Sequence, residues 1–467
     1  MNLDAALEAL AAAGIETDTK PASVKAKSRD FFWYSPVLKA RLDHLVADFV
    51  ATPKSEDEVI ETLRICHAHD VPVTTRGAGT GNYGQAIPLA GGCVLHMAKM
   101  TAVKEIRPGQ VTCEPGILIK NLDAACIAES GQELRMAGST WATASIGGFI
   151  AGGSGGIGSV RWGMLRDVGN IIALRVVTME AEPRVIEVAG DELHRVSHAY
   201  GTNGVITEVT MPLAPAYVWT GIFMAFAAFE DALRYAYEIA HRDGILLKLA
   251  TVCEAPIAKD YFQRVAPHVE AHEALVVLMV APHALPAWET FSAGYPGRTI
   301  YRSDDHDWER APGHVFEYTW NHTTLRALKV DPSITYLQIG YGTEDPMATC
   351  LAVRERLSPE CLQHVEVTRQ EGRVALGSLT LVKFTTEARL EEICAIHEEM
   401  GAPNFNPHRY TLEEGGRQQV DDRQLAFKRE ADPKGLLNPG KMIAWDDPGF
   451  AFDEMYAYPG MKREAAE

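Results

Sequence analysis

Two glycine-rich segments constrain the fold of this chain more than any other feature of its sequence. The first is RGAGTGNYG at residues 76–84, and the second is ASIGGFIAGGSGGIG at residues 144–158. Glycine lets the backbone adopt dihedral angles that other residues avoid, and it lets other groups approach closely. Successive N–H groups in such turns form concavities that bind anions. We therefore expect a large phosphate-bearing cofactor between the two segments, although tight turns without a ligand would need similar glycines.

Polar side chains near these segments could donate further hydrogen bonds to phosphate groups. They are Arg76, Ser139, Thr140, Thr143 and Ser145. Both segments also match the pattern G-x-G-x-x-G, but a Rossmann unit requires a strand before the glycines and a helix after them. Pro88 and Gly91 prevent a useful helix after the first match, and no clear strand precedes the second. A Rossmann fold is therefore not expected.

The composition excludes several classes of protein. The chain has 467 residues, of which 46% are hydrophobic and 23% are charged, as in globular proteins large enough for two domains. Its formal net charge of -18 disfavours binding to nucleic acid or to an anionic membrane surface. No apolar run reaches the ~18–20 residues that span a bilayer, so no membrane insertion is expected.

The cysteines and the first residues indicate a compartment. The chain contains 8 cysteines without any C-x-x-C pair, and buried free thiols are the simplest explanation for them. The opening sequence MNLDAALEALAAAG has acidic residues where a signal peptide needs basic ones. We therefore expect a cytoplasmic protein.

The pattern of helical and strand-like segments divides the chain into four parts. Residues 1–42 begin with a helix that ends near Gly14. Residues 43–215 alternate between helices and strands and contain both glycine-rich segments. Residues 216–400 contain strand-then-helix units such as YVWTGIFMAF followed by FEDALRYAYEIAHRDG, which favour an antiparallel sheet backed by helices. Residues 401–467 are rich in loops.

Five segments of the chain occur in an order that is typical of one flavoprotein family. They are VPVTTRGAGTGNYGQ, EPGILIKNLDAAC, ELRMAGSTWATASIGGFIAGGSGGIGSVRWGMLRD, GTNGVITEVTMPL and DPKGLLNPGKM, within residues 43–215 and 431–443. They resemble the vanillyl-alcohol oxidase/p-cresol methylhydroxylase family, and most closely its glycolate oxidase/D-lactate dehydrogenase-like bacterial members. The resemblance implies an α+β fold. An FAD-binding domain with two subdomains would be joined to a substrate or cap domain, an antiparallel sheet backed by helices, and residues 401–467 would return to the FAD-binding domain.

The resemblance also implies which residues bind FAD. They are Arg76, Gly77, Ala78, Gly79, Thr80, Gly81, Asn82, Tyr83, Pro115, Gly138, Ser139, Thr143, Ser145, Gly147, Gly148, Gly152, Gly204, Val205, Ile206, Asn438 and Lys441. Many members attach FAD to a histidine of the first loop, where this chain has Thr80. The second glycine-rich segment contains no cysteine that could serve as another tether. Non-covalent FAD is therefore expected.

Four residues are candidates for chemistry. His408 is the first candidate for a base because it lies in a polar loop ahead of the C-terminal segment, and histidine titrates near neutral pH. Tyr410 is an alternative proton acceptor, and Arg409 could bind a substrate carboxylate through two hydrogen bonds. His322 belongs to the segment GHVFEYTWNHTTL, where His314, Tyr318 and His322 recur at i, i+4 and i+8. A helix would place these three on one face, either as packing or as part of a metal or substrate site.

No metal is expected, because this chain departs from the segment that metal-using members carry. Members that use a metal carry a GEHG-like segment about thirty residues before NPGK. In this chain the corresponding segment reads FNPHRYTLEEGG, with Pro407 in place of the glutamate.

Together these observations predict an FAD-dependent oxidoreductase that transfers a hydride from a CH–OH group of a small substrate to the flavin. A hydroxy acid is one candidate substrate, and oxygen or another acceptor would reoxidise the flavin. The alternatives are a flavin-binding sensor or partner subunit without turnover, and a metal-dependent hydrolase. The sequence leaves open the choice between oxidase and dehydrogenase, and a homo-oligomer is compatible with it.

Overall fold

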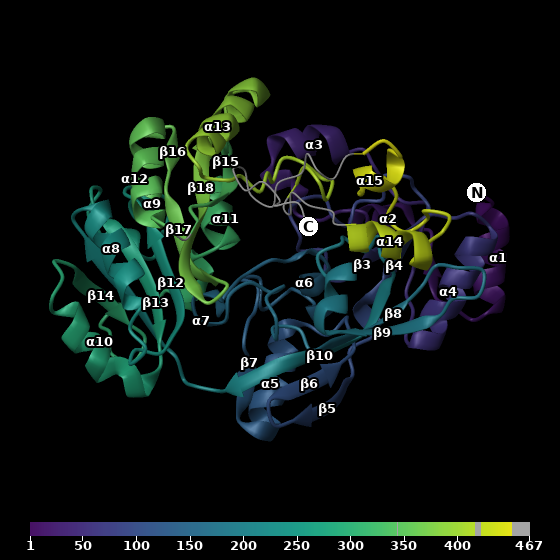
Figure 1. The fold of residues 1–467 in the computed structure, drawn as a ribbon, viewed down its shortest axis with the longest axis horizontal. Coiled ribbons are helices and arrows are strands. Elements are labelled where there is room, and N and C mark those ends of the chain that lie inside the picture. Colours follow the sequence, from purple (N-terminus) through teal and green to yellow (C-terminus); the bar gives the residue numbers. More distant parts are fainter. Residues whose placement is uncertain (343, 416–421, 451–467) are drawn as a thin grey trace, which may run out of the picture.

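The computed structural model describes residues 1–342, 344–415 and 422–450. Figure 1 shows one large sheet with its helices on the left and two smaller sheets on the right. The long strand β10 (Val205–Pro215) leads from the smaller sheets toward β11 (Thr220–Phe226), the first strand of the large sheet. The mixture of helices with largely antiparallel sheets confirms the expected α+β fold class.

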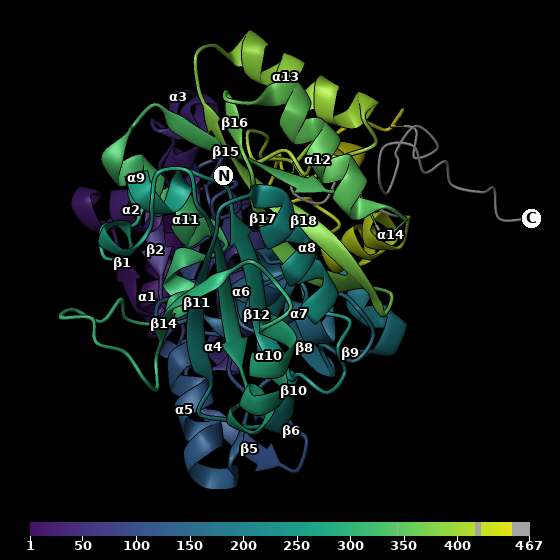
Figure 2. The same cartoon turned by 90° about the vertical axis from the view of Figure 1, so that its left-hand side faces the viewer.

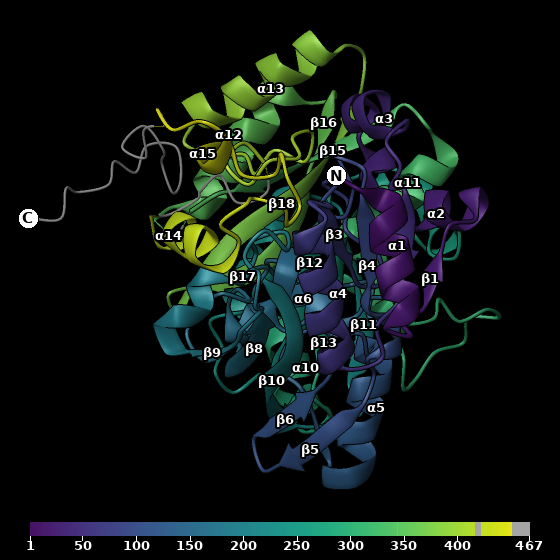
Figure 3. The ribbon, with the colours of Figure 1, turned by 90° about the vertical axis from the view of Figure 1, so that its right-hand side faces the viewer.

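The first small sheet contains a parallel core. Its strands follow the order β1 (Thr17–Asp18), β2 (Phe49–Ala51), β4 (Cys93–His96), β3 (Val73–Arg76). Both β2 and β3 run parallel to β4, and α4 (Glu56–Ala68) connects them. Ser55 caps α4 by accepting a hydrogen bond from the N–H of Glu58 at 3.2 Å. Helix α1 (Leu3–Ala12) packs against α4 (Figure 3).

The second small sheet is antiparallel. Its strands follow the order β5 (Val103–Arg107), β6 (Gln110–Cys113), β10, β8 (Ala173–Val177), β9 (Val185–Ala189), and β7 (Gln132–Leu134) pairs with β10. Helix α5 (Ile119–Ser130) ends at Gly131, whose φ of 64° is left-handed, as is common at helix ends. Helices α5 and α6 (Ile146–Gly152) pack on this sheet through one hydrophobic core.

The large sheet is antiparallel and contains eight strands. Its order is β14 (Arg298–Arg302), β11, β13 (Ala274–Val280), β12 (Leu247–Cys253), β17 (His364–Gln370), β18 (Arg373–Lys383), β15 (Ile334–Gly340), and β16 (Cys361–Leu362) pairs with β18. Figure 2 shows this sheet with helices packed around it. We call this sheet and its helices the cap.

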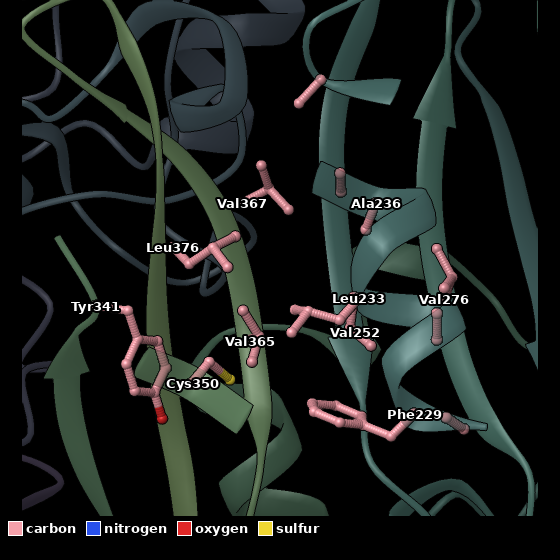
Figure 4. Close-up of a cluster of buried hydrophobic side chains, with 14 of the residues drawn as sticks. Phe229, Leu233, Ala236, Val252, Val276, Tyr341, Cys350, Val365, Val367 and Leu376 are labelled. Carbon is pink, nitrogen blue, oxygen red and sulfur yellow. The ribbon is translucent and has the colours of Figure 1, made fainter. Parts of the chain in front are cut away.

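Helices cover both faces of the cap sheet. One face packs against α8 (Phe229–Ile239), α10 (Leu285–Ser292), α12 (Pro346–Leu357) and α13 (Glu387–Glu399). Figure 4 shows part of this core, where Phe229 and Leu233 of α8 lie against Val252 and Val276 of the sheet. The other face packs against α9 (Ile257–Tyr261) and α11 (Asn321–Val330). Each strand therefore buries alternate residues in two different cores.

The two ends of the described chain return to the small sheets. Residues before β2 form α1, β1, α2 (Pro21–Lys27), η1 (Phe32–Tyr34) and α3 (Pro36–Leu42). Near the other end, α14 (Asp422–Ala431) and α15 (Ile443–Asp446) lie beside the small sheets (Figures 1 and 3). The Val73 N–H of β3 donates to the Leu436 carbonyl at 2.8 Å, which attaches the C-terminal segment to the first sheet.

The remaining elements are short. They are α7 (Ser159–Trp162), η2 (Met97–Lys99), η3 (Gly190–Arg195), η4 (Ala266–His268), η5 (Pro282–Ala284) and η6 (Val315–Tyr318). Within the described residues, no helix combines the length and the apolar character that crossing a bilayer requires.

Candidate flavin and substrate site

One large cavity lies where the glycine-rich segments meet the cap. The loop after β3, the segment around α6 and the residues of η1 form most of its wall. From the cap, the wall receives Trp320, Asn321, His322, Gln338 and Leu379. Segments far apart in the sequence therefore share one continuous cavity.

The glycines allow the two glycine-rich segments to touch. The Ala78 N–H donates to the Oγ of Ser145 at 3.2 Å, and a Cβ on Gly77 would lie only 2.1 Å from the same Oγ. A Cβ on Gly147 would lie 2.5 Å from the Cβ of Pro115. Since real Cβ atoms do not approach other atoms this closely, glycine at these positions lets the neighbouring segments pack together. We call residues 76–84 and 144–158 together the glycine cradle.

Arg76 supports the first loop from behind the cavity wall. Its guanidinium donates to the Arg29 carbonyl at 2.5 Å and to the Ala78 carbonyl at 3.2 Å. A Cβ on Gly79 would lie 1.8 Å from the Nη1 of Arg76, and the φ of Gly79 is +69°. Burial lowers the pKa of Arg76. The sequence suggested a direct phosphate contact, whereas the structure places the guanidinium against the loop backbone.

The C-terminal segment supports the end of the same loop. The Lys441 ammonium donates to the Gly84 carbonyl at 2.7 Å, and the Asn438 amide donates to the Gln85 and Tyr200 carbonyls at 2.8 and 2.7 Å. Burial lowers the pKa of Lys441, and the Asp30 carboxylate opposes this shift. Lys441 and Asn438 therefore lie behind the lining rather than in it.

The other predicted cofactor residues divide into two groups. Those that line the cavity are Gly77, Ala78, Gly79, Thr80, Gly81, Asn82, Tyr83, Pro115, Gly138, Ser139, Ser145, Gly147, Gly148, Gly152, Gly204 and Ile206. Thr143 is exposed, and Val205 is buried in a hydrophobic core, so neither lies in the lining.

His408, the first candidate for the base, is buried away from the cavity lining. Its Nε2 lies 2.9 Å from the Tyr336 carbonyl, which can only accept, so Nε2 carries the proton. Its Nδ1 then accepts from the Ser35 hydroxyl at 2.7 Å. Burial lowers the pKa of His408 to about 4. Both ring nitrogens are thus used in contacts between the N-terminal part of the chain and the cap.

The two neighbours of His408 also lie outside the lining. Arg409 forms an ion pair with Glu391 of α13 at 2.7 Å near the surface. Tyr410 is half-buried, with the Lys441 ammonium 4.9 Å from the centre of its ring. The structure therefore brings neither side chain to the cavity wall.

The expected single helix over His314, Tyr318 and His322 is wrong. The structure has the short 3-10 helix η6, then a break, and α11 begins only at Asn321. Trp320 forms the break with φ 49° and ψ -143°, a conformation that L-residues rarely adopt. His314 is exposed and outside the lining, whereas His322 reaches the cavity.

Several polar atoms in the cavity wall are buried without a hydrogen-bond partner among the described residues. They are Thr75 Oγ1, Trp320 Nε1, Asn321 Oδ1 and His322 Nδ1. Burial lowers the pKa of His322 to about 4, and the charges of Arg326 and Lys329 add to this effect. His322 is therefore neutral at pH 7, and a neutral imidazole offers one acceptor nitrogen. Such unsatisfied groups indicate a wall that contacts a ligand.

Sequence reasoning missed part of the lining. Asp30, Phe31 and Tyr34 come from the N-terminal segment, and Gln338 comes from β15. The aromatic cluster FFWY at residues 31–34 was the one visible signal. Nothing in the pattern around Gln338 distinguishes it from other strand residues. Across the residues that the structure describes, no group of three or more His, Cys, Asp and Glu side chains is placed to hold a metal ion.

The comparisons with known proteins agree with this geometry. Residues 47–187 match the FAD binding domain family. D-lactate dehydrogenase of Archaeoglobus fulgidus is 31% identical over 204 residues, which cover 41% of this chain and 45% of the relative. The glycolate oxidase subunit GlcD of Escherichia coli is 33% identical over 175 residues, covering 36% of this chain and 34% of the relative. The chain thus matches less than half the length of these relatives.

Residues 47–187 are therefore an FAD-binding domain, and these relatives support the resemblance to the vanillyl-alcohol oxidase/p-cresol methylhydroxylase flavoproteins. The chain is also similar in fold to alkyldihydroxyacetonephosphate synthase, with a TM-score of 0.67 at 15% identity over 91% of this chain and 82% of that one. The residues present fit FAD, because the glycine cradle leaves backbone open to the cavity and unsatisfied polar groups surround it.

Proposed function

We propose that this flavoprotein is an FAD-dependent oxidoreductase that acts on a CH–OH group of a small substrate. The observation that carries the proposal is the single cavity that joins the glycine cradle to His322 of the cap. A cofactor bound along the cradle and a substrate beside His322 would share this cavity, which would hold the two reacting groups close together. The relatives named as D-lactate dehydrogenase and glycolate oxidase subunit support the same class of reaction.

His322 is the base in this proposal. FAD, when bound, supplies the acceptor for the hydride. His322 would take the hydroxyl proton at Nδ1, the ring nitrogen that has no partner among the described residues, when the CH–OH group is oxidised to a carbonyl. Asn321, the preceding cavity residue, has an unsatisfied Oδ1 that can accept a hydrogen bond from the substrate. His408 instead keeps its ring nitrogens in structural contacts.

Anaerobic flavin reduction tests this proposal. The purified holoprotein is mixed with D-lactate, glycolate and neutral secondary alcohols, and loss of the flavin's visible absorption is followed. His322→Ala should keep FAD and slow reduction by ~10²–10⁴-fold, the usual span for a positioned acid–base group. His314→Ala is the matched control, since His314 is exposed outside the lining and its loss should leave reduction unchanged.

Each contrary result points to a particular alternative. A flavin that no hydroxyl compound reduces would favour a sensor or partner subunit without turnover. A colourless protein that cannot be reconstituted with FAD would reject the flavoenzyme. An unchanged rate in His322→Ala would remove the base assignment. Preferential reduction by D-lactate or glycolate would support a hydroxy acid substrate, and reduction by neutral alcohols alone would reject it.

The FAD is proposed to be non-covalent. Thr80 lines the cavity in the first loop, at the position where a histidine that binds FAD covalently would be expected. Its hydroxyl does not replace the ring nitrogen of such a histidine. Acid precipitation should release all flavin into the supernatant. A fluorescent protein band after denaturing electrophoresis would contradict this, and would point to His198 or His322, the histidines among the described lining residues.

We further propose that residues 43–215 form the FAD-binding domain and residues 216–400 the cap domain, with residues 1–42 as an N-terminal helical segment. Residues 401–467 would return to the FAD-binding domain, although residues 416–421 and 451–467 of this segment lie outside the described residues. The separate cores of the second small sheet and of the cap sheet support this division. All eight cysteines are buried free thiols, which supports a reducing, cytoplasmic location. Oxygen or another acceptor would reoxidise the flavin, and reoxidation kinetics in air distinguish the two.

A further inference from the structure

Trp320, one of the cap residues that line the cavity, has a strained backbone conformation. With φ 49° and ψ -143°, it occupies a region that suits glycine and not a bulky side chain. It separates η6 from α11, so this one residue sets the direction in which Asn321 and His322 leave the chain. Such strain persists only where surrounding contacts enforce it.

A buried carboxyl group from a distant strand contacts the backbone of this turn. The Trp320 N–H donates to Oε1 of Glu366 at 2.6 Å. Glu366 lies on β17 and is 1% exposed, so the hydrogen bond is shielded from water. A hydrogen bond that is shielded from water in this way is electrostatically stronger than one exposed to solvent.

Two neighbouring side chains hold Glu366 itself in place. The hydroxyl of Thr251, the cross-strand partner on β12, donates to Oε2 of Glu366. The Nε2 of His364 lies 3.0 Å from Oε1 of Glu366 and 3.2 Å from the Thr323 hydroxyl. That hydroxyl gives its own proton to the Tyr318 carbonyl at 2.8 Å, so His364 Nε2 is the donor to both oxygens. Thr323 and Tyr318 flank the strained turn on either side.

The turn presents three consecutive residues to the cavity. Trp320, Asn321 and His322 each line it, and each has a buried polar side-chain atom without a partner among the described residues. The Trp320 ring also reaches the glycine cradle, where a Cβ on Gly155 would lie 3.1 Å from Cη2 of the indole. The turn therefore contacts the glycine cradle from the cap.

We propose that Glu366 is a positioning residue, which fixes the backbone of Trp320 so that Asn321 and His322 face the reacting group. The inference deepens the proposed function and rests on it for the role of His322. Glu366 does not touch the cavity itself, and it acts through the Trp320 N–H. It is joined to the turn from a strand 46 residues away in the chain.

Amide hydrogen exchange tests the contact without turnover. In the FAD-bound protein, Glu366→Ala should speed exchange at the Trp320 amide, read by mass spectrometry on a peptide that contains residue 320. Glu366→Gln should keep protection, because an amide oxygen still accepts the hydrogen bond. Glu254→Ala is the matched control, since Glu254 is another buried carboxylate of the cap and instead accepts from Arg354 and the Gln363 N–H. Unchanged exchange in Glu366→Ala would overturn the proposal.

Flavin reduction tests the consequence. Glu366→Ala should slow the limiting rate by on the order of 10²-fold, as expected when a reacting group is displaced slightly, with FAD affinity unchanged. Glu366→Gln should recover most of that rate. Trp320→Gly provides the decisive background, because glycine adopts a positive φ without strain. In that background, Glu366→Ala should slow flavin reduction by less than about tenfold. An equal loss of rate in both backgrounds would overturn the proposal.

The two readouts separate the inference from the proposed function. If no hydroxyl compound reduces the wild-type flavin while exchange at Trp320 follows the expected pattern, Glu366 holds the turn and the proposed function fails. If reduction proceeds normally in Glu366→Ala, the proposed function stands and the positioning role is rejected.

Discussion

The two sides of the cavity are built in opposite ways. On the cofactor side, glycines let backbone approach backbone, and the supporting side chains of Arg76, Asn438 and Lys441 donate to carbonyl groups of the protein. On the cap side, the bulky residue Trp320 adopts a conformation suited to glycine, and its neighbours have polar atoms without a partner among the described residues.

This difference indicates that the two sides of the cavity have different roles. The glycine cradle is held by internal hydrogen bonds, so its shape exists before a ligand arrives. The cap turn carries strain and unsatisfied groups, which a bound substrate can complete. We expect substitutions in the cradle to change cofactor affinity, and substitutions in the turn to change the rate of flavin reduction. The following predictions test that division, beginning with the largest effect.

Gly147→Ala should cause the largest loss of bound FAD. The new Cβ would lie 2.5 Å from Pro115 Cβ and 3.0 Å from the Pro115 carbonyl oxygen, so the two segments must move apart. We expect a flavin-to-protein absorbance ratio near zero after purification. Gly244→Ala is the control, because a Cβ there meets open space at an ordinary φ. Full FAD content in Gly147→Ala would show that the cradle tolerates separation.

Arg76→Ala should weaken FAD binding to an intermediate extent. It removes charge-assisted hydrogen bonds to the Arg29 and Ala78 carbonyls, which are worth about 1.5–3 kcal/mol. The Kd for FAD should therefore rise by roughly tenfold or more. Fluorescence titration of the apoprotein with FAD measures this. Arg409→Ala should leave the affinity unchanged, because Arg409 pairs with Glu391 outside the lining. Equal affinities in both variants would place the support of the loop elsewhere.

The smallest effect concerns His408, which joins the N-terminal segment to the cap. Its pKa is lowered to about 4, so between pH 7 and pH 6 the unfolded chain binds more protons than the folded one. The free energy of unfolding should therefore fall as the pH falls, by ~0.7 kcal/mol over this interval from His408 alone. Urea denaturation at both pH values measures it, and His408→Gln should reduce the slope. A slope unchanged in the variant would mean that other groups carry the pH dependence.

The fold class and the glycine-rich part of the cavity wall were predictable from the sequence. A glycine at a sterically crowded position carries its information locally, because the missing Cβ determines both the allowed dihedral angles and the closeness of approach. Residues such as Gly77 and Gly147 could therefore be placed at the cavity from their pattern and from a family resemblance. The supporting role of Arg76 could not, since it depends on where the Arg29 carbonyl lies.

The cap side was decided by tertiary structure alone. His408 and His322 are the same residue type in polar surroundings, yet one is enclosed by Ser35 and Tyr336 and the other opens into the cavity. Ser35 lies 373 residues from His408 in the chain, and no local pattern reports such a contact. The helical spacing of His314 and His322 was misleading for the same reason, because the Glu366 carboxylate on another strand stabilises a break at Trp320. By itself the sequence determined where the backbone must lack side chains. The partners of each polar side chain depend instead on strands that only folding brings together.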